Sequence, residues 1–165
     1  MRKLIKDGAI VDDRYLTVTE NEAGELALPA APVLVKLSTW RKHRDALLAH
    51  PHGRGVLLAP DEFADTVAGD LAHLDVIAIE FPAFADGRGY STAALLRGRL
   101  GYRGELRAVG DVFKDTLFYQ QRVGFNAFLV REGKDIEDAL AGLATFSVSY
   151  QGAVDRAPLY RLRGA

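Results

Sequence analysis

From about residue 55 onward, short apolar runs alternate with segments in which apolar residues recur at helical spacing. The expected strands are 56–59, 76–81, 105–109 and 125–130. The expected helices between and after them are 61–74, 91–100, 112–123 and a last one that carries Ile136, Leu140 and Leu143. Strands joined by helices form right-handed crossovers, and near-continuous apolar strands are typical of parallel sheets that are covered on both faces. The sequence therefore predicts an α/β fold in which βαβ units form a mainly parallel sheet.

Capping residues mark the ends of several of these helices. Asp61 and Ser91 are placed to cap the N-termini of two helices, and Gly101 and Gly124 follow the C-termini of two. An open sheet and an arc like part of a TIM-type barrel would both satisfy this pattern. Residues 146–150 are expected to form either a final strand or an extended tail.

The first 54 residues have a mixed character. Short β-prone runs lie at 3–5, 15–19 and 33–37. Turn residues at 7–8 and 12–13 separate the first two runs. A helix is expected over 38–50, with Trp40 and Leu47 on its buried side.

A chain of 165 residues fits one domain, which we expect to combine an N-terminal β/α appendage over 1–54 with a parallel βα core over 55–150.

The chain has no cysteine, which excludes disulfides, thiolate-held metals, cysteine-ligated iron–sulfur clusters and a thiol nucleophile. A formal net charge of −1 argues against a nucleic-acid partner. No apolar run approaches the roughly 20 residues of a membrane span, and the first residues lack the apolar stretch of a signal peptide, so we expect a cytoplasmic protein with no membrane contact.

Ligands of parallel α/β sheets gather at the carboxyl ends of the strands. After the strand at 76–81, the candidate ligand- or partner-binding residues are Asp86, Gly87, Arg88, Gly89, Tyr90 and Ser91. Backbone N–H groups at a helix start suit an anion, and Arg88 could clamp phosphate, sulfite or a carboxylate with two hydrogen bonds. The alternative is a tight loop in which glycines adopt positive φ and Ser91 only caps the helix. The spacing matches neither a phosphate loop nor a dinucleotide fingerprint.

The next strand is followed by Asp111, Lys114 and Asp115, which are further candidates. Asp111 could act as a general base, a metal ligand or a helix cap, and two carboxylates one turn apart could hold Mg²⁺ through water. The alternative is that acidic groups in a first turn only interact favourably with the helix dipole. The four histidines show no metal-ligand spacing, and we expect no metal-binding motif.

Basic residues are enriched over 86–122, with seven basic against four acidic side chains, which could favour a small anion or an anionic partner. Arg97 and Arg107 are candidates for the lining of an anionic pocket. Arg107 interrupts an otherwise apolar strand, and a bare buried charge is costly, so it needs a partner. Glu80, Asp111 and an anionic ligand are the partners that the sequence offers.

Motifs that resemble a known family are concentrated in the second half of the chain, at 81–91, 96–99, 101–112 and 122–128. Together they resemble the bacterial DUF934 family, whose members are described as oxidoreductases or accessory proteins involved in sulfite reduction. The resemblance implies a role beside a sulfite reductase, in sulfur assimilation and cysteine biosynthesis, in which the protein assists the enzyme or supplies it with electrons. It brings no set of catalytic residues.

Two hypotheses follow. In the first, the protein is an accessory factor that docks on a sulfite reductase. In the second, it is a small-anion-binding enzyme, in one version an oxidoreductase, that uses Arg88, Arg107 and Asp111. The sequence offers no thiol, no cluster ligands and no nucleotide fingerprint, so it identifies no cofactor. Whether the protein is an enzyme stays open. We favour the first hypothesis, in which the protein assists a partner that carries the redox centre. Both hypotheses require that the loops bearing Asp86, Arg88 and Asp111 emerge side by side.

Overall fold

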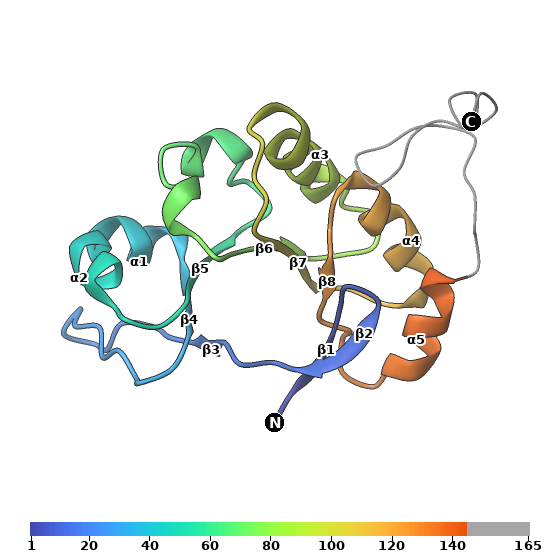
Figure 1. Ribbon diagram of the computed structural model, residues 1–165, viewed down its shortest axis with the longest axis horizontal. Helices are drawn as coiled ribbons and strands as arrows, with labels where there is room; N and C mark the ends of the chain where they lie inside the picture. The colour runs from blue at the N-terminus through green and yellow to red at the C-terminus, as the bar shows by residue number, and fades with distance from the viewer. Residues whose placement is uncertain (145–165) are drawn as a thin grey trace.

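A computed structural model describes residues 1–144, in which one curled sheet of eight strands is lined by helices. Its parallel strands are β3 (Leu16–Thr17), β4 (Val33–Lys36), β5 (Arg54–Leu58), β6 (Val76–Phe81), β7 (Glu105–Gly110) and β8 (Ala127–Phe128). They lie beside one another in chain order, and each is parallel to the next. Figure 1 shows the helices on the outside of this curved row of strands. The predicted mainly parallel α/β fold is confirmed, and the arrangement is the barrel-like arc rather than a flat open sheet.

A hairpin at the N-terminus extends the sheet. Its strands are β1 (Lys3–Lys6) and β2 (Ala9–Asp12), and β1 is antiparallel to β8. Asp7 and Gly8 both have positive φ, at 49° and 79°, which two-residue hairpin turns of type I′ require. The turn at 7–8 was predicted, but the strand β2 was not, because 12–13 was interpreted as a second turn.

The hairpin brings the two edges of the sheet toward each other. Three residues, 13–15, separate the last residue of β2 from the first residue of β3, and these are the two edge strands. A link of this length can span at most about 14 Å. In Figure 1 the N-terminal segment accordingly crosses the open side of the arc.

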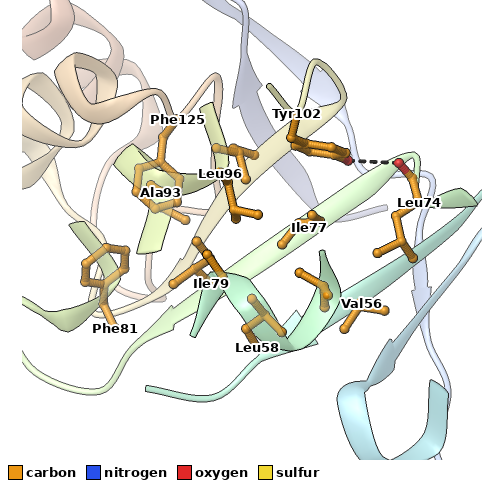
Figure 2. Close-up of a cluster of buried hydrophobic side chains, with 14 of the residues drawn as sticks. Val56, Leu58, Leu74, Ile77, Ile79, Phe81, Ala93, Leu96, Tyr102 and Phe125 are labelled. Atoms are coloured by element: carbon orange, nitrogen blue, oxygen red, sulfur yellow. Dashed lines mark hydrogen bonds between the residues drawn. The ribbon is translucent and has the colours of Figure 1, made fainter. Parts of the chain in front are cut away.

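The core lies between the strands and the outer helices. Strand residues alternate between the two faces, so Ile77, Ile79 and Phe81 of β6 point toward the helices, whereas Val76 and Ala78 point to the concave face. Figure 2 shows the helix-facing residues of β5 and β6 in one cluster with residues of the outer layer. Burial of such side chains contributes roughly 1.5–3 kcal/mol each.

The helices are α1 (Leu37–Lys42), α2 (Arg44–Ala49), α3 (Arg88–Ala94) with its π-helical extension η3 (Leu95–Arg99), α4 (Lys114–Val123) and α5 (Ile136–Leu143). The helix predicted over 38–50 is present but breaks at His43, with Trp40 and Leu47 buried as expected. No helix within residues 1–144 has the length and apolar character needed to cross a membrane. The strand or tail expected at 146–150 lies outside the described residues.

The helix predicted over 61–74 is wrong. Two short 3-10 helices, η1 (Ala64–Val67) and η2 (Leu71–His73), take its place. The carboxylate of Asp70 accepts hydrogen bonds from Trp40 Nε1 and Arg44 Nε, each at 2.9 Å. We attribute the break in the helix to this tertiary contact and to Gly69, which together override the helical spacing of the apolar residues.

The predicted cap at Ser91 is also wrong. Helix α3 begins at Arg88, and Gly87 occupies the N-cap position. The Asp86 carboxylate accepts a hydrogen bond from the backbone N–H of Arg88 at 3.1 Å, so an aspartate rather than a serine satisfies the first donor of the helix. By contrast, Gly101 and Gly124 have positive φ at helix C-termini, as predicted.

Gly110 and Gly101 provide a matched test of the close strand packing. Both have positive φ, at 92° and 68°, but a Cβ at Gly110 would lie 2.4 Å from the carbonyl oxygen of Phe81, whereas a Cβ at Gly101 would meet nothing within 4 Å. We expect Gly101→Ala to lower the free energy of unfolding by about 1 kcal/mol and Gly110→Ala to lower it by at least about 2 kcal/mol more. Urea unfolding followed by circular dichroism measures both; equal losses would contradict the packing argument.

Candidate functional site

The carboxyl ends of β5, β6 and β7 form one edge of the sheet, from which the loops 59–63, 82–87 and 111–113 emerge; we call this edge the carboxyl rim. Phe81 and Gly110 are paired in register at the ends of β6 and β7. The backbone N–H of Asp111 donates a hydrogen bond to the Phe81 carbonyl at 2.7 Å. The loops that bear Asp86, Arg88 and Asp111 therefore emerge side by side, as the sequence led us to expect.

Each of the three loops of the carboxyl rim contributes a phenylalanine, and we call Phe63, Phe84 and Phe113 the aromatic row. Phe63 is 48% exposed and Phe84 is 64% exposed, while Phe113 is half-buried. The rings of Phe84 and Phe113 are in contact, with centroids 5.7 Å apart. Exposed aromatic side chains on adjacent loops are typical of surfaces that bind other proteins.

The arginine of the loop after β6 is already engaged. Arg88 donates from Nη2 to Asp86 Oδ2 at 2.6 Å and from Nε to Asp86 Oδ1 at 3.0 Å, which is a bidentate pair. The hydrogen bonds from Arg88 lower the pKa of Asp86, and the same contact raises the pKa of Arg88. The pair is electrically neutral, so this guanidinium attracts an anion less strongly than an unpaired arginine would.

The charged groups of the loop after β7 are paired in the same way. Asp111 forms an ion pair with Arg131, whose guanidinium lies 4.9 Å from the centre of the Phe113 ring. Lys114 donates to Asp138 at 2.8 Å across the start of α4 and α5, and this contact raises the pKa of Lys114. Asp115 is exposed in the first turn of α4. Within residues 1–144 no three acidic or histidine side chains are grouped as metal ligands.

The remaining candidates near α3 have mainly structural contacts. A Cβ at Gly89 would lie 2.7 Å from the Phe81 ring, so the glycine lets α3 pack closely on β6. Tyr90 packs edge-on against Phe81, with centroids 5.2 Å apart, and burial raises its pKa. Ser91 is exposed on α3, and Gly87 lies exposed at the N-cap.

Arg97 lies away from the carboxyl rim, at the amino-terminal ends of β7 and β8. Its guanidinium donates to the carbonyl oxygens of Gly124, Tyr102 and Gly104 at 2.7–2.9 Å and to Asn126 Oδ1 at 3.1 Å. Burial lowers its pKa. The structure therefore gives Arg97 four protein acceptors and a role in fastening the turn between η3 and β7.

Arg107 faces the concave side of the sheet and is 2% exposed. It donates from Nη1 to Asp13 at 2.9 Å and from Nε to Glu105 at 2.7 Å. The partners offered by the sequence, Glu80 and Asp111, are therefore wrong as ion-pair partners. Strand alternation places Glu105 and Arg107 on one face, so this partner could have been found, whereas Asp13 is brought in from 94 residues away.

These contacts belong to a series of five alternating charges that we call the charge chain: Arg2, Asp13, Arg107, Glu105 and Lys6. Arg2 pairs with Asp13 at 3.2 Å, and Lys6 pairs with Glu105 at 2.9 Å. The charge chain therefore ties the N-terminal hairpin and the segment after it to the middle of β7. Sequence reasoning missed Arg2, Asp13 and Lys6, because no local pattern links them to β7.

Tyr15 packs against the charge chain. Its ring centre lies 5.4 Å from the guanidinium carbon of Arg107. Burial, and then the negative charges of Asp75 and Glu105, raise the pKa of Tyr15 to about 12. The phenol is therefore neutral at physiological pH and remains so under mildly alkaline conditions.

The sequence matches a protein-family model. A family model described as "Bacterial protein of unknown function (DUF934)" matches residues 55–160. This range includes β6 to β8, β5 from its second residue, and all residues of the carboxyl rim. No curated protein matches the sequence.

The charge chain gives a stability prediction. Asp13→Ala leaves the buried Arg107 with one carboxylate instead of two, and removing one partner of a buried pair costs about 3–5 kcal/mol. Asp12→Ala is the control, because exposed Asp12 only reaches Lys3 at 4.0 Å, and we expect a change under about 0.5 kcal/mol. Urea unfolding measures both, and similar small losses would show that the charge chain is not stabilising.

Tyr15 gives a prediction about pH. Its pKa is raised above the ordinary value of 10.0, so its contribution to stability is complete below about pH 10 and is lost as the pH rises toward about 12. We expect Tyr15→Phe to lose less free energy of unfolding between about pH 9 and about pH 11 than the unmodified protein. Urea unfolding at both pH values tests this. Identical losses in the two proteins would show that Tyr15 does not couple ionisation to folding.

Proposed function

Because the chain belongs to the bacterial DUF934 family, we propose that it is an accessory protein of assimilatory sulfite reduction that docks on a sulfite reductase through its carboxyl rim. The resemblance of its motifs supplies the pathway. The observation that carries the mode of action is the aromatic row, in which Phe63 and Phe84 are exposed and Phe84 contacts Phe113. The arginines beside it, Arg88 and Arg131, are paired within the chain.

Docking agrees with the chemistry of the carboxyl rim better than anion binding does. Arg88 and Arg131 each have a carboxylate partner, Asp86 and Asp111, and each pair is electrically neutral, so neither arginine offers an anion an uncompensated positive charge. Arg107, the other arginine of the enzyme hypothesis, lies on the concave face with two carboxylate partners. The residues of that hypothesis therefore do not converge on one rim pocket.

The aromatic row has the properties of an interface centre. A few aromatic side chains near the middle of an interface carry most of the binding energy, and paired charges around them set orientation more than affinity. The contact of Phe84 with Phe113 partly orders the Phe84 ring, which reduces the side-chain entropy lost when a partner covers it. A chain without cysteine is suited to assist a partner that carries the redox centre.

Phe84→Ala tests the docking surface, with Tyr119→Ala as its matched control. Both aromatic side chains are 64% exposed, but Tyr119 lies on α4 and does not belong to the aromatic row. We expect Phe84→Ala to weaken binding to the purified sulfite reductase about 30-fold, the loss of a central aromatic contact of about 2 kcal/mol. We expect Tyr119→Ala to change binding by less than about twofold. Calorimetry with the reductase from the same bacterium measures both.

Growth provides the second readout. A bacterium that lacks the protein should grow poorly on sulfate as its sulfur source and normally on added cysteine. The unmodified protein and Tyr119→Ala should restore growth, and Phe84→Ala should restore it less. Normal growth of the deletion strain on sulfate would overturn the pathway, whereas equal effects of the two variants would overturn the surface.

A further inference from the structure

The concave face carries a hollow of about 490 Å³ that shares no residue with the carboxyl rim. Leu4 and Lys6 of β1 and Val11 of β2 form one side of it. Arg14 and Tyr15 of the connecting segment form another side, and Arg107 of β7 lies at the base. The volume is within the usual range for sites that bind small molecules.

Arg107 is held in place before any ligand arrives. Its Nε and Nη1 groups donate to Glu105 and Asp13, which leaves Nη2 without a hydrogen-bond acceptor among residues 1–144. The side chain nevertheless lines the hollow. A guanidinium fixed by two carboxylates is preorganised, because the entropy of ordering it is lost on folding rather than on binding.

The charges around the hollow favour a single negative charge on a ligand. Lys6, Arg14 and Arg107 stand against Glu105 and Asp12, so the lining has one positive charge in excess. Arg14 is exposed and forms no ion pair within the described part of the chain. Burial raises the pKa of Tyr15 to about 12, so its phenol is neutral at physiological pH and adds no negative charge to the hollow.

The lining of the hollow also has apolar surface, which favours a ligand with an apolar part. Leu4 and Val11 of the hairpin contribute aliphatic side chains to the lining, and Val11 is the more exposed of the two. An inorganic ion would leave this surface in water, whereas a small ring or short hydrocarbon would cover it. The lining therefore combines the fixed guanidinium of Arg107, the exposed guanidinium of Arg14 and the aliphatic side chains of Leu4 and Val11.

We propose that this concave hollow binds an organic monoanion, with one carboxylate or sulfonate group carried on a small apolar body. The oxyanion lies between Arg107 and Arg14, and the apolar body lies against Leu4 and Val11. The proposal concerns the isolated protein and does not depend on docking at the carboxyl rim.

Titration of the ¹⁵N-labelled protein with small probes, followed by NMR, tests the proposal. Benzoate and benzenesulfonate should bind with dissociation constants in the millimolar range and shift amide signals of β1, β2 and the segment 13–15. Benzamide has the same ring without the charge, and inorganic sulfate has charge without the ring. Both should bind at least about tenfold more weakly than benzoate.

Variants locate the site. Arg14→Gln should weaken benzoate about tenfold, while Arg103→Gln, which removes another exposed arginine beside a different hollow, should change it by less than about twofold. Val11→Trp places an indole into the hollow from the edge strand β2 and should abolish binding with the melting temperature unchanged within about 3 °C. Equal effects of the two arginine variants, benzamide or sulfate binding as tightly as benzoate, or shifts confined to the carboxyl rim would each overturn the proposal.

Discussion

The buried contact of Arg107 with Asp13 and Glu105 is the interaction on which the rest of the molecule depends. A curled row of parallel strands covered by helices on one side has an open concave face, and β7 lies in the middle of it. The charge chain fastens the N-terminal segment onto that face, and Tyr15 covers the guanidinium. A buried ion pair gives little net stability, but breaking it is costly, so it specifies where the segment lies more than how stable the protein is.

This closure separates two surfaces with different chemistry. The carboxyl rim is made by loops that follow β5, β6 and β7; the arginines beside it are paired with carboxylates, and it exposes aromatic side chains. The concave hollow is made by the N-terminal hairpin and β7, and there the cations outnumber the anions. An anion and a protein partner would therefore not compete for one site, whereas the sequence alone suggested a single site for both.

The sequence predicted the parts of the fold that depend on local periodicity. The strands β6 and β7 were found because their apolar runs are continuous, and Gly101 and Gly124 because a helix end favours positive φ. The prediction of a helix over 61–74 was wrong, in part because Asp70 accepts hydrogen bonds from Trp40 of α1 and Arg44 of α2. The partners predicted for Arg107 were wrong for a related reason, since a strand pattern can reveal that Arg107 and Glu105 share a face but not that Asp13 reaches them.

A protein with paired rim charges and no thiol can still act through its shape. The loops of the aromatic row follow adjacent strands, and the hydrogen bond from Asp111 to Phe81 fixes the spacing of two of them. Rings that already contact each other, as those of Phe84 and Phe113 do, can bind a matching surface with a smaller loss of side-chain entropy than separate, freely rotating rings. The pairing of Arg88 with Asp86 is then an advantage rather than a loss, because a guanidinium left free beside Phe84 would have to be desolvated whenever a partner covered the rim.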